Sequence, residues 1–206
     1  AGLVTSPDGG TLLALDDIKV KLSGLQILDG VSIEVPQGKV TGLIGPNGAG
    51  KTTVFNVISG FVKSDSGSVV YRGRALKHIK AHKLTKMGIS RTLQGVGLFS
   101  SLTALENVML GGSARVRSGI ISQSFAMPWT DIETERLRVL SLAAMEEMGI
   151  ADEAARPPGE LPYPIQKKVA LARALVSDPA ILLLDEPAGG VGAADMADLE
   201  RLIRSW

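Results

Sequence analysis

The sequence predicts an α/β domain built around a mostly parallel sheet. Short β-branched segments alternate with helical segments along the first half of the chain, and this alternation is typical of a parallel sheet covered by helices. A glycine-rich segment, 45–50, lies between one of these strands and the next helix. Later in the chain, residues 180–184 are apolar throughout, as expected of a strand that is buried on both faces.

Composition limits the classes of protein to which the chain can belong. Its 206 residues fit one domain, with or without a subdomain, and 45% of them are hydrophobic, which is enough for a sizeable core. The absence of cysteine excludes a disulfide-stapled scaffold, a thiolate metal site and a cysteine nucleophile. No apolar run approaches the ~18 residues that span a bilayer. The chain does not start with a basic segment followed by an apolar stretch, so we expect no signal peptide.

The expected strands are short apolar or β-branched runs bounded by Gly, Asp, Pro or Ser. They span 18–21, 31–35, 40–44, 68–71, 89–92 and 180–184. The expected helices span 51–59, 75–87, 103–110, 130–148, 165–176 and 195–203, and the intervening stretch 111–130 is expected to be mainly loop. Glycines at 60, 88 and 149 stand where three of these helices should stop.

Hydrophobic periodicity supports the helices at 51–59 and 130–148. In the first, Val54, Val57 and Ile58 fall on one face. The second begins with Thr130 and Glu133, whose spacing is that of a capping box. Its expected core-facing stripe comprises Ile132, Leu137, Leu140, Ala144 and Met148.

Charge is nearly balanced over the whole chain but not within residues 63–91. This segment holds eight Lys or Arg residues against a single acid, Asp65. One interpretation is a basic patch for nucleic acid or lipid headgroups, and the other is an ordinary solvated face. Because aromatic side chains that would stack on bases do not alternate with the basic ones, we favour the solvated face.

The strongest motif is the glycine-rich loop at 45–53, which fits G-x-x-x-x-G-K-[ST] and lies between a predicted strand and a predicted helix. Its residues are Gly45, Pro46, Asn47, Gly48, Ala49, Gly50, Lys51, Thr52 and Thr53. Glycines let successive backbone amides turn toward one anion, and the helix N-terminus adds its dipole. Lys51 can reach the β- and γ-phosphates, and the Thr52 hydroxyl can hold Mg²⁺. A chance match is expected about once per hundred random chains, before this context lowers it.

A second motif ends the apolar strand at 181–184 with two carboxylates, Asp185 and Glu186. In an open α/β sheet, ligands bind at the carboxyl ends of the strands. Asp185 could hold Mg²⁺ through a water molecule, and Glu186 could polarise a water for attack on the γ-phosphate. The alternative is an acidic strand end that merely faces solvent. Together the two motifs are typical of P-loop NTPases.

Further segments extend the likeness to a family. Residues 88–94, 97–99 and 102–108 resemble the Q-loop region of ABC-transporter ATPases. Residues 161–163, followed by 166–175, resemble the signature motif of that family and its helix. The resemblance covers nearly the whole chain, and its wording is most similar to the ATP-binding subunits of branched-chain amino-acid importers.

The resemblance implies a fold and a division of the chain. It implies a P-loop core with a mostly parallel sheet, N-terminal antiparallel strands and an inserted helical subdomain, and with C-terminal strands that are missing from this sequence. The N-terminal β region and core then span 1–94, the helical subdomain 95–164, and the signature helix with the return to the core 165–206.

The resemblance also implies roles for individual residues. The loop 45–53 binds ATP, and Lys51 acts on its phosphates. Thr52 and Gln94 approach Mg²⁺ and Asp185 supports it. Gln94 also senses the transmembrane partner, and Glu186 is the catalytic base. The implied partners are transmembrane permease subunits and a second ATP-binding subunit, identical or not, with no nucleic acid. The implied location is the cytoplasmic face of the inner membrane.

The sequence departs from the family pattern at several positions. Pro164 and Ile165 replace Gly and Gln in the signature, so a backbone N–H donor and a side-chain donor are lost, although Pro is tolerated in a first helical turn. Leu22 stands where an aromatic residue commonly stacks on adenine. The only histidines, His78 and His82, lie upstream of the position of the family's γ-phosphate histidine.

These departures leave several functions open. The chain is either a transport ATPase subunit, or a degenerate or truncated subunit that binds nucleotide without hydrolysing it. An ABC-type ATPase acting on nucleic acid is a weaker alternative that rests on the basic segment alone.

Overall fold

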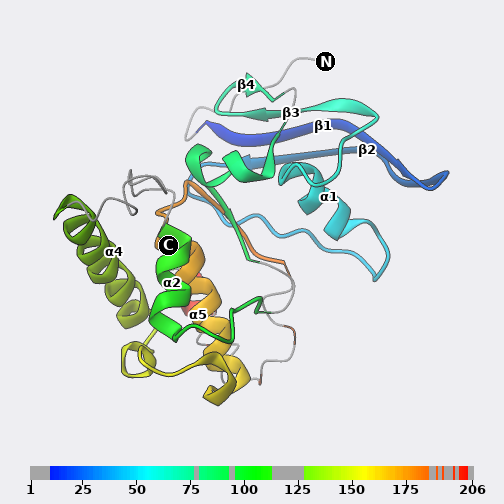
Figure 1. Ribbon diagram of the computed structural model, residues 1–206. Coiled ribbons are helices and arrows are strands. Elements are labelled where there is room, and N and C mark those ends of the chain that lie inside the picture. Colours follow the sequence, from blue (N-terminus) through cyan, green and yellow to red (C-terminus); the bar gives the residue numbers. More distant parts are fainter. Residues whose placement is uncertain are drawn as a thin grey trace. The chain divides into compact units, whose positions relative to one another are not determined.

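The protein is described from a computed structural model, which covers residues 10–76, 79–92, 96–112, 128–185, 189, 192, 197 and 200–203. The chain divides into two compact units at the junction of Lys83 and Leu84. The N-terminal antiparallel strands and helix α1 belong to the first unit (Figure 1). The helical region and a short parallel sheet belong to the second.

An antiparallel sheet forms the first unit. Its strands are β1 (Thr11–Leu22), β2 (Leu25–Pro36), β3 (Ser66–Tyr71) and β4 (Arg74–Ala75), in the order β2-β1-β3-β4. Every neighbouring pair is antiparallel. The inner strand β1 supplies five fully buried or nearly buried side chains, which are Leu13, Ala14, Leu15, Ile18 and Val20. The strands predicted at 18–21, 31–35 and 68–71 are confirmed, although two of them extend well beyond the predicted bounds.

Helix α1 (Lys51–Ile58) covers this sheet and confirms the helix predicted at 51–59. It buries the predicted face, Val54, Val57 and Ile58. Gly60 follows it in the left-handed region at φ 70°, where a Cβ would collide with the carbonyl oxygen of Ile79. This glycine is therefore required both by the backbone turn and by the close approach.

Two predictions for residues 40–87 are wrong. Residues 40–44 form no strand, since no strand among the described residues pairs with them, and Ile44 is left 94% exposed. The helix predicted at 75–87 is replaced by β4 and by two short 3₁₀ turns, Ala81–Lys83 and Thr85–Met87. Its start is taken into the sheet because Ala75 pairs with Val70 and the Leu76 N–H donates to the Val69 carbonyl oxygen.

Among its described residues, the second unit combines a parallel strand pair with three long helices and a final helical segment. Strands β5 (Ile89–Arg91) and β6 (Ile181–Leu183) pair in parallel register. They lie within the predicted strands 89–92 and 180–184. Among the described strands, this is the parallel pairing, and it forms a sheet separate from that of the first unit. The helices are α2 (Ala104–Gly112), α4 (Pro128–Glu147) and α5 (Tyr163–Leu175), with 3₁₀ turns at Ala151–Glu153 and Pro158–Glu160. Residues 197 and 200–203 are helical, within the predicted helix 195–203.

The three helices share one aliphatic core. Helix α2 lies beside α5 (Figure 1), and the carbonyl oxygen of Arg173 would collide with a Cβ at Gly111, so the backbones approach closely there. The core residues are Ala104, Val108, Leu137, Ala144, Met145, Met148, Ile150, Leu161, Val169, Leu171, Ala172 and Val176. The absence of aromatic residues from this cluster agrees with the composition.

The predicted beginning of the helix at 130–148 needs correction. Helix α4 already begins at Pro128, so Thr130 lies inside it and cannot be its cap. Of the predicted stripe, Leu137, Ala144 and Met148 are buried, whereas Ile132 and Leu140 are exposed. The predicted stop at Gly149 is confirmed by its φ of 64°. Of the predicted loop at 111–130, residues 111–112 and 128–130 are helical, and 113–127 lie outside the described residues.

A capping box does occur, but on α2. The Thr103 N–H donates to Glu106 Oε2 at 2.8 Å, and the Glu106 N–H donates to Thr103 Oγ1 at 3.2 Å. Each side chain therefore satisfies a backbone donor that the helix start would leave without a partner. Along the described ranges, no helix is both long and apolar enough to cross a membrane.

The capping box predicts a specific dependence of stability on pH. The hydrogen bonds from the Thr103 N–H and then from its hydroxyl hold the pKa of the Glu106 carboxyl below its usual value. A carboxyl whose pKa is lower in the folded state stabilises the fold above its unfolded pKa, and that contribution is lost as the pH falls through the folded pKa.

Glu106→Gln should therefore lose stability relative to wild type at pH 7 and approach it at acidic pH. Urea unfolding followed from pH 7 to pH 3 measures this, with Glu135→Gln as a control at an exposed helical glutamate. A constant difference between wild type and Glu106→Gln across this range would contradict the account.

Candidate functional site

The glycine-rich loop turns the chain into α1 through left-handed backbone. Gly48 and Gly50 both have φ of 83°, a region that other L-residues rarely adopt. Gly50 is the N-cap of α1, and no side chain caps the helix there. The first intrahelical hydrogen bond runs from the Val54 N–H to the Gly50 carbonyl oxygen at 3.0 Å. The three N–H groups that precede Val54 in the helix thus have no acceptor within it.

Gly50 also lies against the sheet. A Cβ at this position would come within 2.7 Å of Leu28 Cδ2 and 3.1 Å of the Ile27 carbonyl oxygen. At Gly48 a Cβ would meet no atom within 4 Å. The requirement for glycine is therefore conformational at residue 48, and both conformational and steric at residue 50.

The Lys51 side chain folds back over the loop. Its Nζ donates to the carbonyl oxygens of Gly45 and Pro46, at 2.7 Å in each case. The ammonium group of Lys51, the first residue of α1, is thus held against the backbone of the loop. Together with the helix N-terminus, it places positive charge next to the loop.

These observations fit a phosphate group. The loop offers free helix N–H donors and an ammonium group, and the first turn of α1 contains no acidic residue that would repel an anion. Thr52, in that first turn, is exposed and Thr53 is partly buried. Thr52 therefore offers a hydroxyl of the kind that completes a Mg²⁺ shell. Leu22 ends β1 and is 44% exposed, so it offers an apolar surface without an aromatic face.

The carboxylate motif lies at the end of β6 in the second unit. Asp185 follows this strand by two residues and is buried. Its Oδ2 accepts a hydrogen bond from Arg91 Nη2 at 2.9 Å. The sequence analysis did not assign a role to Arg91. Glu186 and Gln94, the predicted catalytic base and Q-loop residue, lie outside the described residues.

The signature segment, 161–165, leads into α5. Pro162 is the N-cap, and Pro164 is the second residue of the helix, as expected of a proline in a first turn. Pro164 has no N–H, so one backbone donor is missing from the N-terminus of α5. Ile165 packs against the aliphatic core. The Gln166 side chain donates to the Leu161 carbonyl oxygen at 2.8 Å and so turns back on its own segment.

The far end of α5 holds the segment that follows Gln94 in the sequence. Arg173 donates to the carbonyl oxygens of Gly97 and Val96, at 2.8 and 3.2 Å. Burial lowers the pKa of the Arg173 guanidinium. Helix α5 therefore links the signature segment at one end to the chain beyond the Q-loop at the other.

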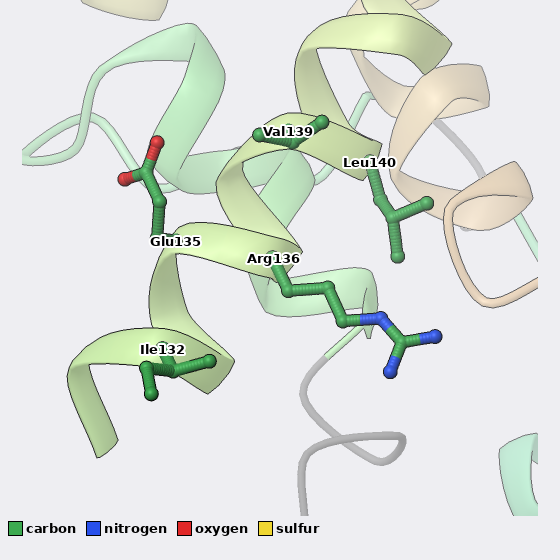
Figure 2. Close-up of a pocket in the computed structure, with 5 residues that line it drawn as sticks. All are labelled: Ile132, Glu135, Arg136, Val139 and Leu140. Carbon is green, nitrogen blue, oxygen red and sulfur yellow. The ribbon is translucent and has the colours of Figure 1, made fainter. Parts of the chain in front are cut away.

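A shallow groove of about 600 Å³ lies on α4 (Figure 2). Ile132, Val139 and Leu140 supply its apolar wall, and Glu135 and Arg136 flank it. Figure 2 shows these side chains along one exposed side of a single helix. The groove offers neither a glycine-rich turn nor a helix N-terminus, so it has no features of a nucleotide site. Among the described residues, no cluster of three or more His, Cys, Asp or Glu could hold a metal ion by itself.

Comparison with known proteins supports an assignment to one family. Residues 28–189 match the family model described as ABC transporter. The chain is 35% identical over 194 residues to LivG of Salmonella typhimurium, a high-affinity branched-chain amino acid transport ATP-binding protein, covering 93% of this chain and 75% of LivG. It is 32% identical over 192 residues to BraF of Pseudomonas aeruginosa, which carries the same description, with the same coverage.

Solved structures give the same result. The ADP conformation of MJ1267, an ATP-binding cassette of an ABC transporter, superimposes with a TM-score of 0.80 at 31% identity, covering 95% of this chain and 76% of that one. The dimeric cassette MJ0796, bound to ADP and Pi, superimposes with a TM-score of 0.76 at 25% identity, covering 93% and 81%.

The loop geometry predicts unequal effects of alanine at its two glycines. Gly48→Ala should cost about 1–2 kcal/mol, which is the penalty of a left-handed alanine. Gly50→Ala should cost about 1–3 kcal/mol more, because its Cβ also overpacks Leu28 and Ile27. Urea unfolding in the absence of nucleotide measures both, with Gly38→Ala as a control at a similarly left-handed but open glycine (φ 67°). Equal losses for the two loop variants would contradict the geometry.

Proposed function

Because the chain belongs to the ABC transporter family and is an ATP-binding subunit, we propose that it binds Mg²⁺–ATP at the glycine-rich loop and hydrolyses it to drive import of a branched-chain amino acid. The loop geometry carries the first part of this proposal. It combines left-handed glycines, an uncapped helix start and an inward-turned Lys51 in one place. The solute class rests on the relatives that are described as branched-chain amino acid transport proteins.

We assign the chemistry to residues as follows. The backbone of residues 45–53 and the Lys51 ammonium bind the phosphates. Thr52, Gln94 and Asp185 would hold Mg²⁺, which would neutralise charge on the phosphate oxygens. Glu186 accepts a proton from the attacking water. Leu22 contacts the adenine through apolar surface alone.

The proposed partners follow from the family. A second ATP-binding subunit, identical or different, would complete the pair, in keeping with the dimeric state of the cassette MJ0796. Transmembrane permease subunits would bind the helical part of the chain and hold it at the cytoplasmic face of the inner membrane. We also propose that the chain divides into a core at 1–94, a helical subdomain at 95–164 and a return to the core at 165–206.

A second candidate function is nucleotide binding without turnover. The first turn of α5 favours it, since Pro164 removes a backbone donor and Ile165 is packed into the core. In this family the signature of one subunit serves the ATP held by the other, so the defect would fall on the site of the partner. The relatives LivG and BraF are described as amino acid transport proteins, which favours transport over action on nucleic acid.

ATP binding through the loop predicts a large effect of Lys51→Ala. Loss of its charge-assisted hydrogen bonds should weaken Mg²⁺–ATP binding by about ten- to a hundredfold in isothermal titration calorimetry. Lys63→Ala, at an exposed lysine of the same unit, is the control and should bind like wild type. Equal affinities of the Lys51→Ala and wild-type chains would contradict binding at this loop.

The two candidate functions differ in phosphate release. If the altered signature limits turnover, wild type alone should release phosphate slowly, and the double variant P164G/I165Q should release it about a hundredfold faster, since donors to the transferred phosphoryl group carry effects of this size. Vanadate-sensitive phosphate release measures both rates. Pro157→Gly controls for a proline lost outside the signature segment. Equal rates for wild type and the double variant would show that Pro164 and Ile165 are not the limit.

A further inference from the structure

A buried ion pair joins the two strands of the parallel sheet. Arg91 Nη2 lies 2.9 Å from Asp185 Oδ2, and the two side chains are only 11% and 5% exposed. Both residues belong to the second unit. Among the described residues, Asp185 is the buried acid, while the other ion pairs join more exposed side chains.

The backbone fixes the two partners of this pair. In the parallel register Arg91 stands opposite Leu183, two residues before Asp185. The residues on either side of Arg91 form hydrogen bonds with β6 and with Ser177, which precedes it. The Thr92 N–H donates to the Leu183 carbonyl oxygen at 3.0 Å, and the hydroxyls of Ser90 and Ser177 lie 2.7 Å apart. Strand pairing thus fixes where the guanidinium meets the carboxylate. An ion pair between two mobile side chains on the surface has no such restraint.

Burial gives this pair a consequence that an exposed pair lacks. Exposed ion pairs contribute little because water solvates each charge by itself. A buried carboxylate that loses its partner keeps its desolvation cost without compensation. The Arg91 guanidinium also acts through directional N–H donors, so it restrains the orientation of the carboxylate as well as its charge.

We propose that Arg91 is a positioning residue for Asp185: its guanidinium holds Oδ2 and so restrains the orientation of the carboxylate that would support Mg²⁺. This inference rests on the proposed function, in which Asp185 supports the metal. Carboxylates at metal sites are commonly oriented by outer partners of this kind, and loss of such a partner weakens metal binding by about ten- to a hundredfold.

The first test measures metal binding directly. Mn²⁺ is used as a paramagnetic probe for Mg²⁺, and free Mn²⁺ is followed by electron paramagnetic resonance with ATP kept below the protein concentration, because unbound ATP would itself chelate the metal. Arg91→Met should weaken Mn²⁺ binding about ten- to a hundredfold. Arg91→Lys, which keeps the charge but not the planar fork, should restore part of the loss. Arg156→Met, which removes an exposed arginine paired with Glu153, should bind like wild type.

This readout separates a positioning role from a structural one. A residue that merely joins β5 to β6 would lower the unfolding temperature without changing Mn²⁺ affinity in the folded chain. Mn²⁺ binding by Arg91→Met at wild-type affinity would therefore overturn this inference but leave the proposed function intact. Wild-type binding of ATP with no metal dependence would instead overturn the proposed role of Asp185, and this inference with it.

The second test needs neither ATP nor metal. Unfolding by urea in EDTA is compared for wild type, Arg91→Met, Asp185→Asn and the double variant. The two residues should be coupled. The loss of stability in the double variant should therefore be smaller than the sum of the two single losses, by a factor of at least about ten in the unfolding equilibrium constant. Because the double variant removes both charges of the buried pair, it should fold even if Arg91→Met does not. Additive effects would overturn the pairing on which the inference depends.

Discussion

The glycine-rich loop depends on a backbone that only glycine adopts without strain. At Gly48 and Gly50 the chain enters the left-handed region, and this reversal turns it from the extended stretch before the loop into helix α1. The same reversal leaves the N–H groups of the first helical turn without intrahelical acceptors. It also lets Lys51 reach back to the carbonyl oxygens of Gly45 and Pro46. Close packing of Gly50 on Leu28 then ties this loop to the antiparallel sheet.

In the second unit the comparable constraint is the burial of polar groups, which must find partners. Arg91 satisfies Asp185 across the parallel strands. The buried side-chain amide of Asn107 also finds partners. It accepts a hydrogen bond from the Phe99 N–H and donates to the Phe99 and Thr103 carbonyl oxygens. Arg173 holds Val96 and Gly97 against α5. Together these contacts hold β5 and residues 96–99 in place within the second unit.

Sequence patterns predicted the features that depend on near neighbours in the chain. The loop, α1 and the glycine at residue 60 follow from residues within one short segment, and so does the place of Pro164 in the first turn of α5. Predictions failed where distant residues decide. A helix was predicted at 75–87 with a stop at Gly88, but pairing with β3 takes Ala75 and Leu76 into the sheet. Residues 40–44 have strand composition without a described strand to pair with.

The ion pair between Arg91 and Asp185 illustrates the same limit. Both residues lie in segments whose strand character was predicted, but their contact depends on the parallel register of β5 with β6, which the sequence pattern does not specify. The capping box at Thr103 and Glu106 is different, since its spacing is present in the sequence just as that of Thr130 and Glu133 is, and only the structure distinguishes the two.

Amide hydrogen exchange at the glycine-rich loop tests the central claim most directly. If the phosphates of ATP take up the N–H groups of the loop and the first turn of α1, Mg²⁺–ATP should slow exchange in residues 48–53 of the wild-type chain and leave β1 unchanged. The same addition should have little effect on Lys51→Ala. A folded wild-type chain whose loop amides exchange equally fast with and without Mg²⁺–ATP would contradict the account.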